Sequence, residues 1–349
     1  MRADRNGDLI SRRSGRCALR PEVLVPGLAT AIGSLPLADA HKAAALALEA
    51  HPRLPAAPQL ARAREGVVAQ WAAALPEVAI ADDGSLAVDA TRVFEPVVPV
   101  FTQQAHGGLL AFLEQAVAME HAPARVKLQL CGPLTLGVAL TRAGLDPETA
   151  FARAGAALGA WAPALEALVA SALPDAAVLV FLDEPSLVLW RRGEAPLERE
   201  AAVDVLSGSL AAFTATTGVH VCGEGDLRLA YEAGPRVLGA PVSGDLLADA
   251  DVVARHLDAD GWFAWGAVPT DRPIGESADP LWRATVAVWC ELTRRGCDPV
   301  ALRTHGIVTP ACGLAGHGPS QAERALRLAG SLAERVGDQA AAVKLTVGA

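Results

Sequence analysis

The residues best suited to chemistry in this sequence are one histidine and two cysteines, His220, Cys222 and Cys312. His220 and Cys222 are separated by one residue, so on an extended strand their side chains point the same way. An imidazole nitrogen and a thiolate are ligands that zinc prefers, and Cys312 offers a third. Ligands so far apart in sequence are typical of a catalytic zinc site, which leaves one coordination position open. The alternative is that both cysteines are small buried hydrophobic residues and that His220 is a core histidine.

The elements that would position these side chains follow from an alternation of short β-type runs with longer helical runs. Eight strands are predicted, at Ala29–Pro36, Phe94–Thr102, Val126–Pro133, Ala177–Pro185, Val219–Gly223, Arg236–Val242, Trp262–Pro269 and Gly306–Gly313. The clearest helical runs are Asp39–His51, Gly108–His121, Pro147–Ser171 and Ser320–Val336. We therefore predict an α/β protein with a single (β/α)8 TIM barrel over residues 28–349 and a flexible N-terminal extension over residues 1–27.

The competing fold is an open, doubly wound sheet. No G-x-G-x-x-G motif follows the first predicted strand, which counts against the dinucleotide-binding form of that fold. In a barrel, the carboxyl ends of all the strands meet at one mouth. Polar residues fall at those ends in this chain, namely Ser34, Cys131, Asp183, Glu184, His220, Cys222, Asp245, Asp271 and Cys312. Residues that are distant in sequence are therefore expected to converge in space.

The composition excludes several other classes of protein. The chain has 349 residues, of which 52% are hydrophobic, so it can bury a large core. A net charge of −9 with 4% aromatic residues argues against nucleic-acid binding, which needs a basic face or stacking aromatics. No apolar run reaches the length of a membrane span, and no apolar segment follows the N-terminal arginines as in a secretory signal. Six cysteines in so long a chain indicate free thiols, metal ligands or catalytic residues rather than a disulfide scaffold, and we expect a cytoplasmic protein.

Five short motifs together resemble the catalytic C-terminal barrel of cobalamin-independent methionine synthase, a family that shares its barrel class with uroporphyrinogen decarboxylase. The motifs occur in order, at Ala31–Pro36, Gly132–Thr135, Leu182–Leu187, His220–Cys222 and Thr309–Leu314. The resemblance extends from Thr30 to Leu328. It implies a zinc-dependent methyltransferase that forms methionine from homocysteine.

The resemblance also implies the metal ligands. The H-x-C pair of the family corresponds to His220 and Cys222, and its late cysteine corresponds to Cys312. Together they would bind Zn²⁺, which holds the homocysteine sulfur as a thiolate. The family has a fourth ligand, a glutamate after the sixth strand. The nearest carboxylate in this chain is Asp245, and Glu224 is a second candidate.

The substrate contacts follow from two further motifs of the family. Its I-G-S segment, which touches the amino-acid substrate, corresponds to Ile32, Gly33 and Ser34. Its D-E-P aspartate, which pairs with the substrate ammonium group, corresponds to Asp183, with Glu184 beside it.

The residues alone leave other roles open. Asp183 could cap a helix or pair with Arg191 or Arg192, and Ser34 could be an ordinary turn residue. The family's substrate-binding glutamate has no clear counterpart, and Glu95 and Glu114 are the candidates.

Two features of the family concern the methyl donor. Full-length members of the family carry a second barrel that helps to hold folate, whereas this sequence matches the catalytic barrel. The family's histidine after the seventh strand, a proton source for the donor, is also missing, because Ala267–Asp271 contains none. We therefore expect a methylated corrinoid protein or methyl-tetrahydrofolate, with the corrinoid preferred. The alternatives are a corrinoid-linked methyltransferase that acts on another thiol, and a non-catalytic zinc-binding paralogue.

Overall fold

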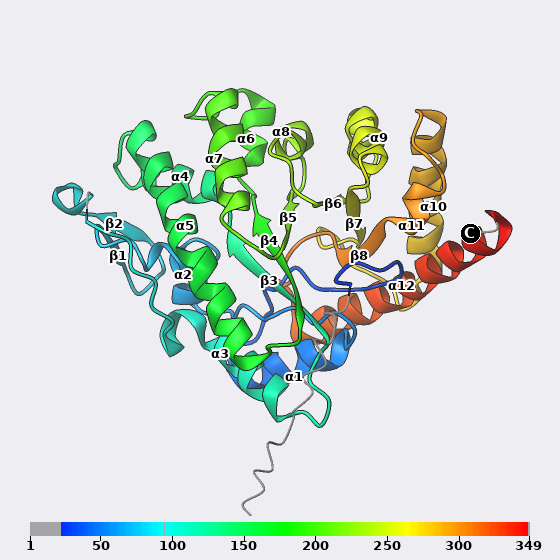
Figure 1. Ribbon diagram of the computed structural model, residues 1–349, viewed down its shortest axis with the longest axis horizontal. Coiled ribbons are helices and arrows are strands. Elements are labelled where there is room, and N and C mark those ends of the chain that lie inside the picture. The colour runs from blue at the N-terminus through cyan, green and yellow to red at the C-terminus, as the bar shows by residue number, and fades with distance from the viewer. Residues whose placement is uncertain (1–21, 94, 348–349) are drawn as a thin grey trace, which may run out of the picture.

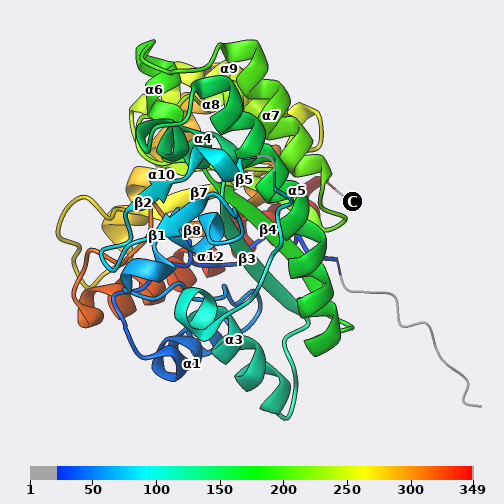
Figure 2. The same cartoon turned by 90° about the vertical axis from the view of Figure 1, so that its left-hand side faces the viewer.

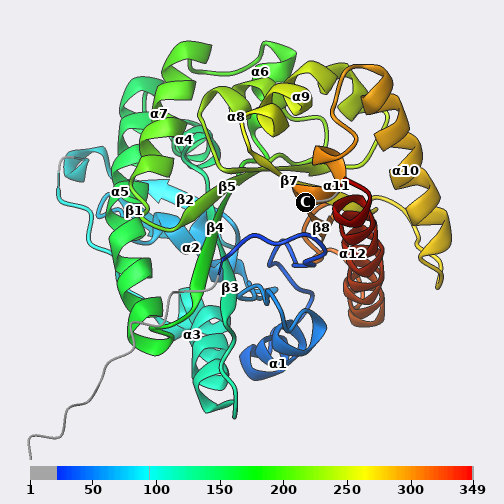
Figure 3. The ribbon, with the colours of Figure 1, turned by 45° about the vertical axis from the view of Figure 1, so that its right-hand side comes forward.

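A six-stranded parallel sheet forms the centre of the computed structural model, which describes residues 22–93 and 95–347. The strands lie in sequence order, as β3 (Arg125–Cys131), β4 (Ala177–Asp183), β5 (Thr216–His220), β6 (Val237–Pro241), β7 (Trp262–Val268) and β8 (Gly306–Pro310). The sheet curls, and helices cover its outer side (Figure 1, Figure 3). The α/β class and six of the predicted strands are confirmed.

Twelve helices are found in the described residues, and they include the four predicted ones. Their bounds are α1 (Ala40–Ala50), α2 (Ala69–Ala72), α3 (Gln103–Ala118), α4 (Pro133–Arg142), α5 (Pro147–Ala172), α6 (Leu187–Arg192), α7 (Arg199–Ala211), α8 (Leu227–Glu232), α9 (Ala250–Asp258), α10 (Asp279–Arg294), α11 (Ala301–Thr304) and α12 (Pro319–Val347). Short 3-10 turns are η1 (Ala63–Glu65), η2 (Ala90–Arg92) and η3 (Asp245–Asp249). Side chains of Asp39, Thr102 and Asp146 accept hydrogen bonds from backbone N–H groups that would otherwise be unpaired in the first turns of α1, α3 and α5.

Two extended segments lie between the edge strands β8 and β3 of the curled sheet. Residues 28–30 pair with β8, since Thr30 N donates to Val308 O at 3.0 Å and Val308 N donates to Leu28 O at 2.9 Å. Residues 33–35 pair with Gln59, and residues 55–57 pair with Lys127 of β3. Each contact is an isolated bridge rather than a continuous ladder, so the predicted first strand is present only as a bridged segment.

The predicted second strand, Phe94–Thr102, is wrong. Residue 94 lies outside the described residues, and residues 95–102 belong to no strand. Pro96 and Pro99 have no N–H to donate, which explains why this valine-rich run does not pair as a strand. Residues 55–57 lie beside β3 instead. A hairpin of β1 (Val78–Ile80) and β2 (Leu86–Val88), which was not predicted, lies outside the main sheet (Figure 2).

Side-chain alternation along the strands divides the core into two parts. In β4, Val180 and Leu182 pack under the helices, whereas Leu179 and Phe181 point to the inner side of the curled sheet. The inner apolar cluster consists of Leu24, Leu28, Leu54, Leu179, Phe181, Val237, Trp262, Ala264 and Ile307. Its member Leu24 comes from the predicted N-terminal extension, of which residues 1–21 lie outside the described residues. The next inward position of β4 is Asp183, at the carboxyl end of the strand.

A buried histidine in the outer core predicts a pH-dependent stability. His106 of α3 contacts Trp71, Phe101 and Trp161, and burial lowers its pKa from 6.5 to about 4. In the unfolded chain the histidine gains a proton as the pH falls below 6.5, whereas in the folded protein it stays neutral until about pH 4. The free energy of unfolding is therefore at its full value above pH 6.5 and decreases as the pH falls towards 4. We expect His106→Phe to flatten the pH dependence of the unfolding free energy in this window by up to about 3 kcal/mol. Urea unfolding at several pH values measures this, and equal slopes in both proteins would contradict it.

Candidate metal centre

His220, Cys222 and Cys312 meet at the carboxyl ends of β5 and β8. His220 is the last residue of β5, Cys222 lies two residues further on, and Cys312 lies two residues after β8. One donor atom of each residue lies within 4.8 Å of the others, and Cys222 Sγ is 3.8 Å from Cys312 Sγ. In the part of the chain that the structure describes, no other group of three His, Cys, Asp or Glu side chains meets in this way.

The geometry of this group fits zinc. Two sulfurs at about 2.3 Å from a tetrahedral zinc ion lie about 3.8 Å apart, whereas a disulfide bond is about 2.05 Å long. The observed separation of 3.8 Å between the two sulfurs agrees with two zinc-bound thiolates and excludes a disulfide bond. His220 is only 2% exposed, and its Nε2 has no hydrogen-bond partner among the described residues. Such a buried, unpaired nitrogen is costly unless a ligand satisfies it. These three residues could therefore hold a metal ion.

The two thiols differ in their readiness to lose a proton. The hydrogen bond between the sulfurs, together with His220, lowers the pKa of Cys312 to about 4. The same hydrogen bond and burial raise the pKa of Cys222 well above its ordinary value. Of the two thiols, Cys312 is therefore the one whose thiolate form is favoured. A cation bound between the sulfurs would favour the loss of both protons, as is usual when thiols coordinate metal ions.

Asp183 lies next to His220, since the last residues of β4 and β5 are in register. Its side chain is buried, and Oδ1 has no hydrogen-bond partner among the described residues. Burial raises the pKa of Asp183, and the positive charge of Lys127 opposes that rise. This unpaired, buried carboxylate oxygen lies beside the three candidate metal ligands and is suited to accept hydrogen bonds from a positively charged part of a bound ligand.

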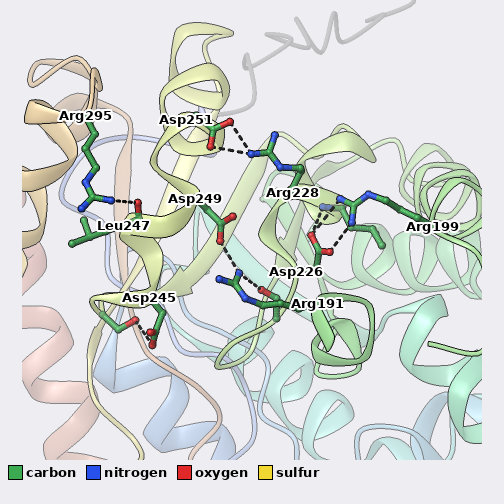
Figure 4. Close-up of polar contacts among 12 residues, drawn as sticks. Arg191, Arg199, Asp226, Arg228, Asp245, Leu247, Asp249, Asp251 and Arg295 are labelled. Carbon is green, nitrogen blue, oxygen red and sulfur yellow. Dashed lines mark hydrogen bonds and ion pairs between the residues drawn. The ribbon is translucent and has the colours of Figure 1, made fainter. Parts of the chain in front are cut away.

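The alternative partners of Asp183 are engaged elsewhere. Arg191 donates to Asp249 Oδ2 at 2.8 Å and to the carbonyl of Gly225 (Figure 4). Arg192 lies 3.9 Å from Glu224, which is exposed. The N-cap residue of α6, the helix that follows β4, is Ser186. Asp183 is therefore neither paired with these arginines nor a cap of that helix.

Glu184, a predicted substrate contact, is hydrogen-bonded to the start of α4. Both of its oxygens accept hydrogen bonds from the start of α4, from Leu134 N at 2.8 Å, Thr135 N at 2.8 Å and Thr135 Oγ1 at 2.6 Å. Gly132, the residue before α4, must lack a side chain, because an added Cβ would lie 2.1 Å from Glu184 Oε1. Burial raises the pKa of Glu184 to about 7 in spite of these donors. The carboxyl group therefore joins β4 to α4 and is not free to bind a substrate.

Removing this cap is expected to cost stability. Glu184→Ala would leave three buried donors unpaired, so we expect a loss of about 2–4 kcal/mol in the unfolding free energy. Glu184→Gln keeps one acceptor oxygen and should lose about 1 kcal/mol. Urea unfolding measures both, with the exposed Glu120→Ala as the control, which should stay within about 0.5 kcal/mol of the parent. A Glu184→Ala loss no larger than that of the control would contradict the capping role.

The Ile32–Ser34 segment lies against the chain that follows Cys312. Leu314 N donates to Ser34 O at 2.9 Å, and a Cβ added at Gly313 would lie 2.0 Å from Ser34 Oγ. Ser34 therefore packs against the residue that follows Cys312. Gly33 has a φ of +134°, and an added Cβ would overlap the Gln129 side chain, so glycine is required there.

The structure does not bring the predicted fourth ligand to the group. Asp245 is exposed at the start of η3, and its carboxylate accepts a hydrogen bond from Ser243 Oγ at 3.4 Å (Figure 4). Glu224, the second candidate, is exposed beside Arg192. Within the described residues, the group holds one nitrogen and two sulfur donors and no carboxylate.

The remaining strand-end candidates lie outside the group. Cys131 is buried in register with Asp183, and burial raises its pKa well above the ordinary value. Asp271, Glu95 and Glu114 are exposed. Two further buried polar side chains, Lys127 and Gln129 of β3, were not predicted. The signal was present, because both occupy alternate positions of the run Val126–Cys131 and therefore share one face.

No protein-family model matches this chain, and no curated protein sequence matches it either. The family resemblance therefore depends on the five sequence motifs.

Proposed function

We propose that this protein is a zinc-dependent S-methyltransferase that methylates the thiol of homocysteine to form methionine. The observation that carries the proposal is the meeting of His220, Cys222 and Cys312 with a sulfur separation suited to zinc. The unpaired Oδ1 of Asp183 supports an amino-acid substrate with an ammonium group. The bridged segments between β8 and β3 support a complete (β/α)8 barrel, whose mouth would be the site.

Each residue of the site would have a distinct task. Zinc, when bound, supplies an open coordination position that favours the thiolate form of the substrate. Asp183 would accept hydrogen bonds from the substrate ammonium group, and the Ile32–Ser34 segment would hold its backbone. The substrate sulfur forms a bond to the methyl carbon while the bond from that carbon to the donor breaks, and the donor keeps the electron pair. Fixing both the sulfur and the head group directs the attack.

We propose a methylated corrinoid as the donor rather than methyl-tetrahydrofolate. The segment after β7 reads Pro269-Thr270-Asp271 and offers no imidazole to protonate a folate leaving group, and Asp271 is exposed.

We also propose that the protein works in the cytoplasm. Among the described residues, α5 is the one helix long and apolar enough to cross a membrane by length and composition. Its apolar face is buried against α4 and α7, as in the core helix of a soluble protein.

Methyl transfer tests the proposal directly. Zinc-loaded protein is incubated with homocysteine and either methylcobalamin or methyl-tetrahydrofolate, and methionine is measured. We expect methionine with methylcobalamin, and less product from a simple thiol that lacks the amino-acid head group. Equal turnover with the folate would overturn the corrinoid preference, and equal use of the simple thiol would favour another substrate. Zinc binding without methyl transfer from either donor would favour a non-catalytic zinc protein.

A further inference from the structure

A fully buried lysine lies on the inner face of β3, close to the proposed substrate contacts. Lys127 is 1% exposed, and its Nζ donates hydrogen bonds to the carbonyl of Ile32 and to Gln129 Oε1. It also lies 5.2 Å from the centroid of the Phe181 ring. Lysine is almost never fully buried unless its charge is paired. The proposed reaction gives this side chain no task.

The negatively charged group that favours the ammonium form of Lys127 is the carboxylate of Asp183. Both side chains are buried at the inner side of the sheet, and each shifts the pKa of the other towards the charged form. Burial lowers the pKa of Lys127 to about 8 although the charge of Asp183 opposes this, so the ammonium form still prevails at neutral pH. No hydrogen bond joins the two groups in the described part of the chain, and Asp183 Oδ1 remains unpaired. Lys127 therefore lies buried on the same inner side of the sheet as Asp183 and leaves its Oδ1 unoccupied.

Lys127 also supports the segment that leads to Ser34. Its contact with the Ile32 carbonyl is one of two supports from β3, because Gln129 lies directly against Gly33. Gln129 is itself held, since its Nε2 donates to Ala57 O at 2.7 Å. The turn at residues 32–34 therefore depends on a buried polar pair of β3, whereas the metal group is built from β5 and β8.

We propose that Lys127 is a positioning residue for the amino-acid head of the substrate. Its ammonium group fixes the Ile32–Ser34 segment through the Ile32 carbonyl and balances the Asp183 carboxylate, which stays free to receive the ammonium group of a zwitterionic thiol. This inference depends on the proposed function, because the segment and Asp183 are the substrate contacts of that proposal. It extends the proposal by stating how the enzyme selects amino thiols over simple thiols.

Ligand binding to cobalt-substituted protein tests the inference without turnover. Cys222 and Cys312 would already give a sulfur-to-cobalt charge-transfer band, and a further thiolate that joins Co²⁺ increases it. The increase gives a Kd for homocysteine and for 4-mercaptobutyrate, the analogue without the ammonium group. For Lys127→Met we expect the Kd of homocysteine to rise about tenfold or more and that of 4-mercaptobutyrate to change less than about twofold. The cobalt content should not change. Lys42→Met, at an exposed lysine of α1, is the matched control and should change neither Kd.

A second variant covers the case in which Lys127→Met does not fold. Gln129→Leu removes one partner of Lys127 but no charge, and we expect a selective loss of about threefold or more for homocysteine. Equal losses for both thiols in the folded variants would assign Lys127 a purely structural role and overturn the inference, as would no loss at all. A parent protein whose band does not increase with homocysteine overturns the proposed function itself, and the inference with it. An increase in the parent, with the same Kd for homocysteine in the variants, overturns the inference alone.

Discussion

Replacing Cys312 with serine is expected to abolish stoichiometric zinc binding. The variant retains His220 and Cys222, but a serine hydroxyl does not replace a thiolate as a zinc ligand. We expect the zinc Kd to weaken about a hundredfold or more, because each ligand contributes a large share of the binding free energy. Competition with a chromophoric chelator measures the Kd, and the zinc content after dialysis provides an independent value. Methyl transfer should be lost together with the metal.

The matched control is Cys290→Ser. Cys290 is an exposed free cysteine of α10, so its replacement tests the chemical change from sulfur to oxygen outside the group. We expect zinc binding and activity equal to those of the parent protein. A Cys312→Ser protein that keeps full zinc and full activity would contradict the ligand assignment.

Asp183→Asn is expected to keep zinc and to lose the selective binding of homocysteine. The amide has nearly the same volume, but it removes the negative charge that would pair with the substrate ammonium group and that balances Lys127. A charge-assisted hydrogen bond contributes about 1.5–3 kcal/mol, so we expect the Kd of homocysteine to rise about tenfold to a hundredfold. The Kd of 4-mercaptobutyrate should change little. The cobalt band measures both values.

The control for this variant is Asp245→Asn, which removes an exposed carboxylate that follows β6. Because Asp245 lies outside the metal group, we expect unchanged metal content and unchanged Kd values for both thiols. If Asp183→Asn weakens both thiols equally, the aspartate does not recognise the ammonium group. If Asp245→Asn releases the metal, Asp245 is a ligand after all.

The sequence predicted the second half of the fold well, for a physical reason. Strands buried on both faces, such as Ala177–Asp183, require nearly continuous apolar runs, and these runs end abruptly at polar residues. Because parallel strands all end at the same edge, His220 and Cys312 could be placed together without knowledge of the intervening loops.

The first half was harder to predict because its extended segments make only single bridges. The predicted strand Ala29–Pro36 pairs only through isolated bridges, and residues 55–59 follow no alternating pattern long enough to identify a strand. Residues 95–102 are β-type in composition but contain prolines. The fourth metal ligand could not be predicted either, because the position of Asp245 depends on the conformation of the turn after β6. The inward face shared by Lys127 and Gln129 could be predicted from the sequence, but the contact of Lys127 with the backbone carbonyl of Ile32 could not, because no side-chain pattern reveals it.

We propose that His220, Cys222 and Cys312 hold one zinc ion that accepts a substrate thiolate. Zinc K-edge X-ray absorption of the purified protein, recorded with and without homocysteine, tests it most directly. We predict about one zinc per chain, with two sulfur ligands in the free protein and three after homocysteine is added. A sulfur count that does not rise on addition of homocysteine would contradict thiol activation, and a protein that binds no zinc would contradict the metal centre itself.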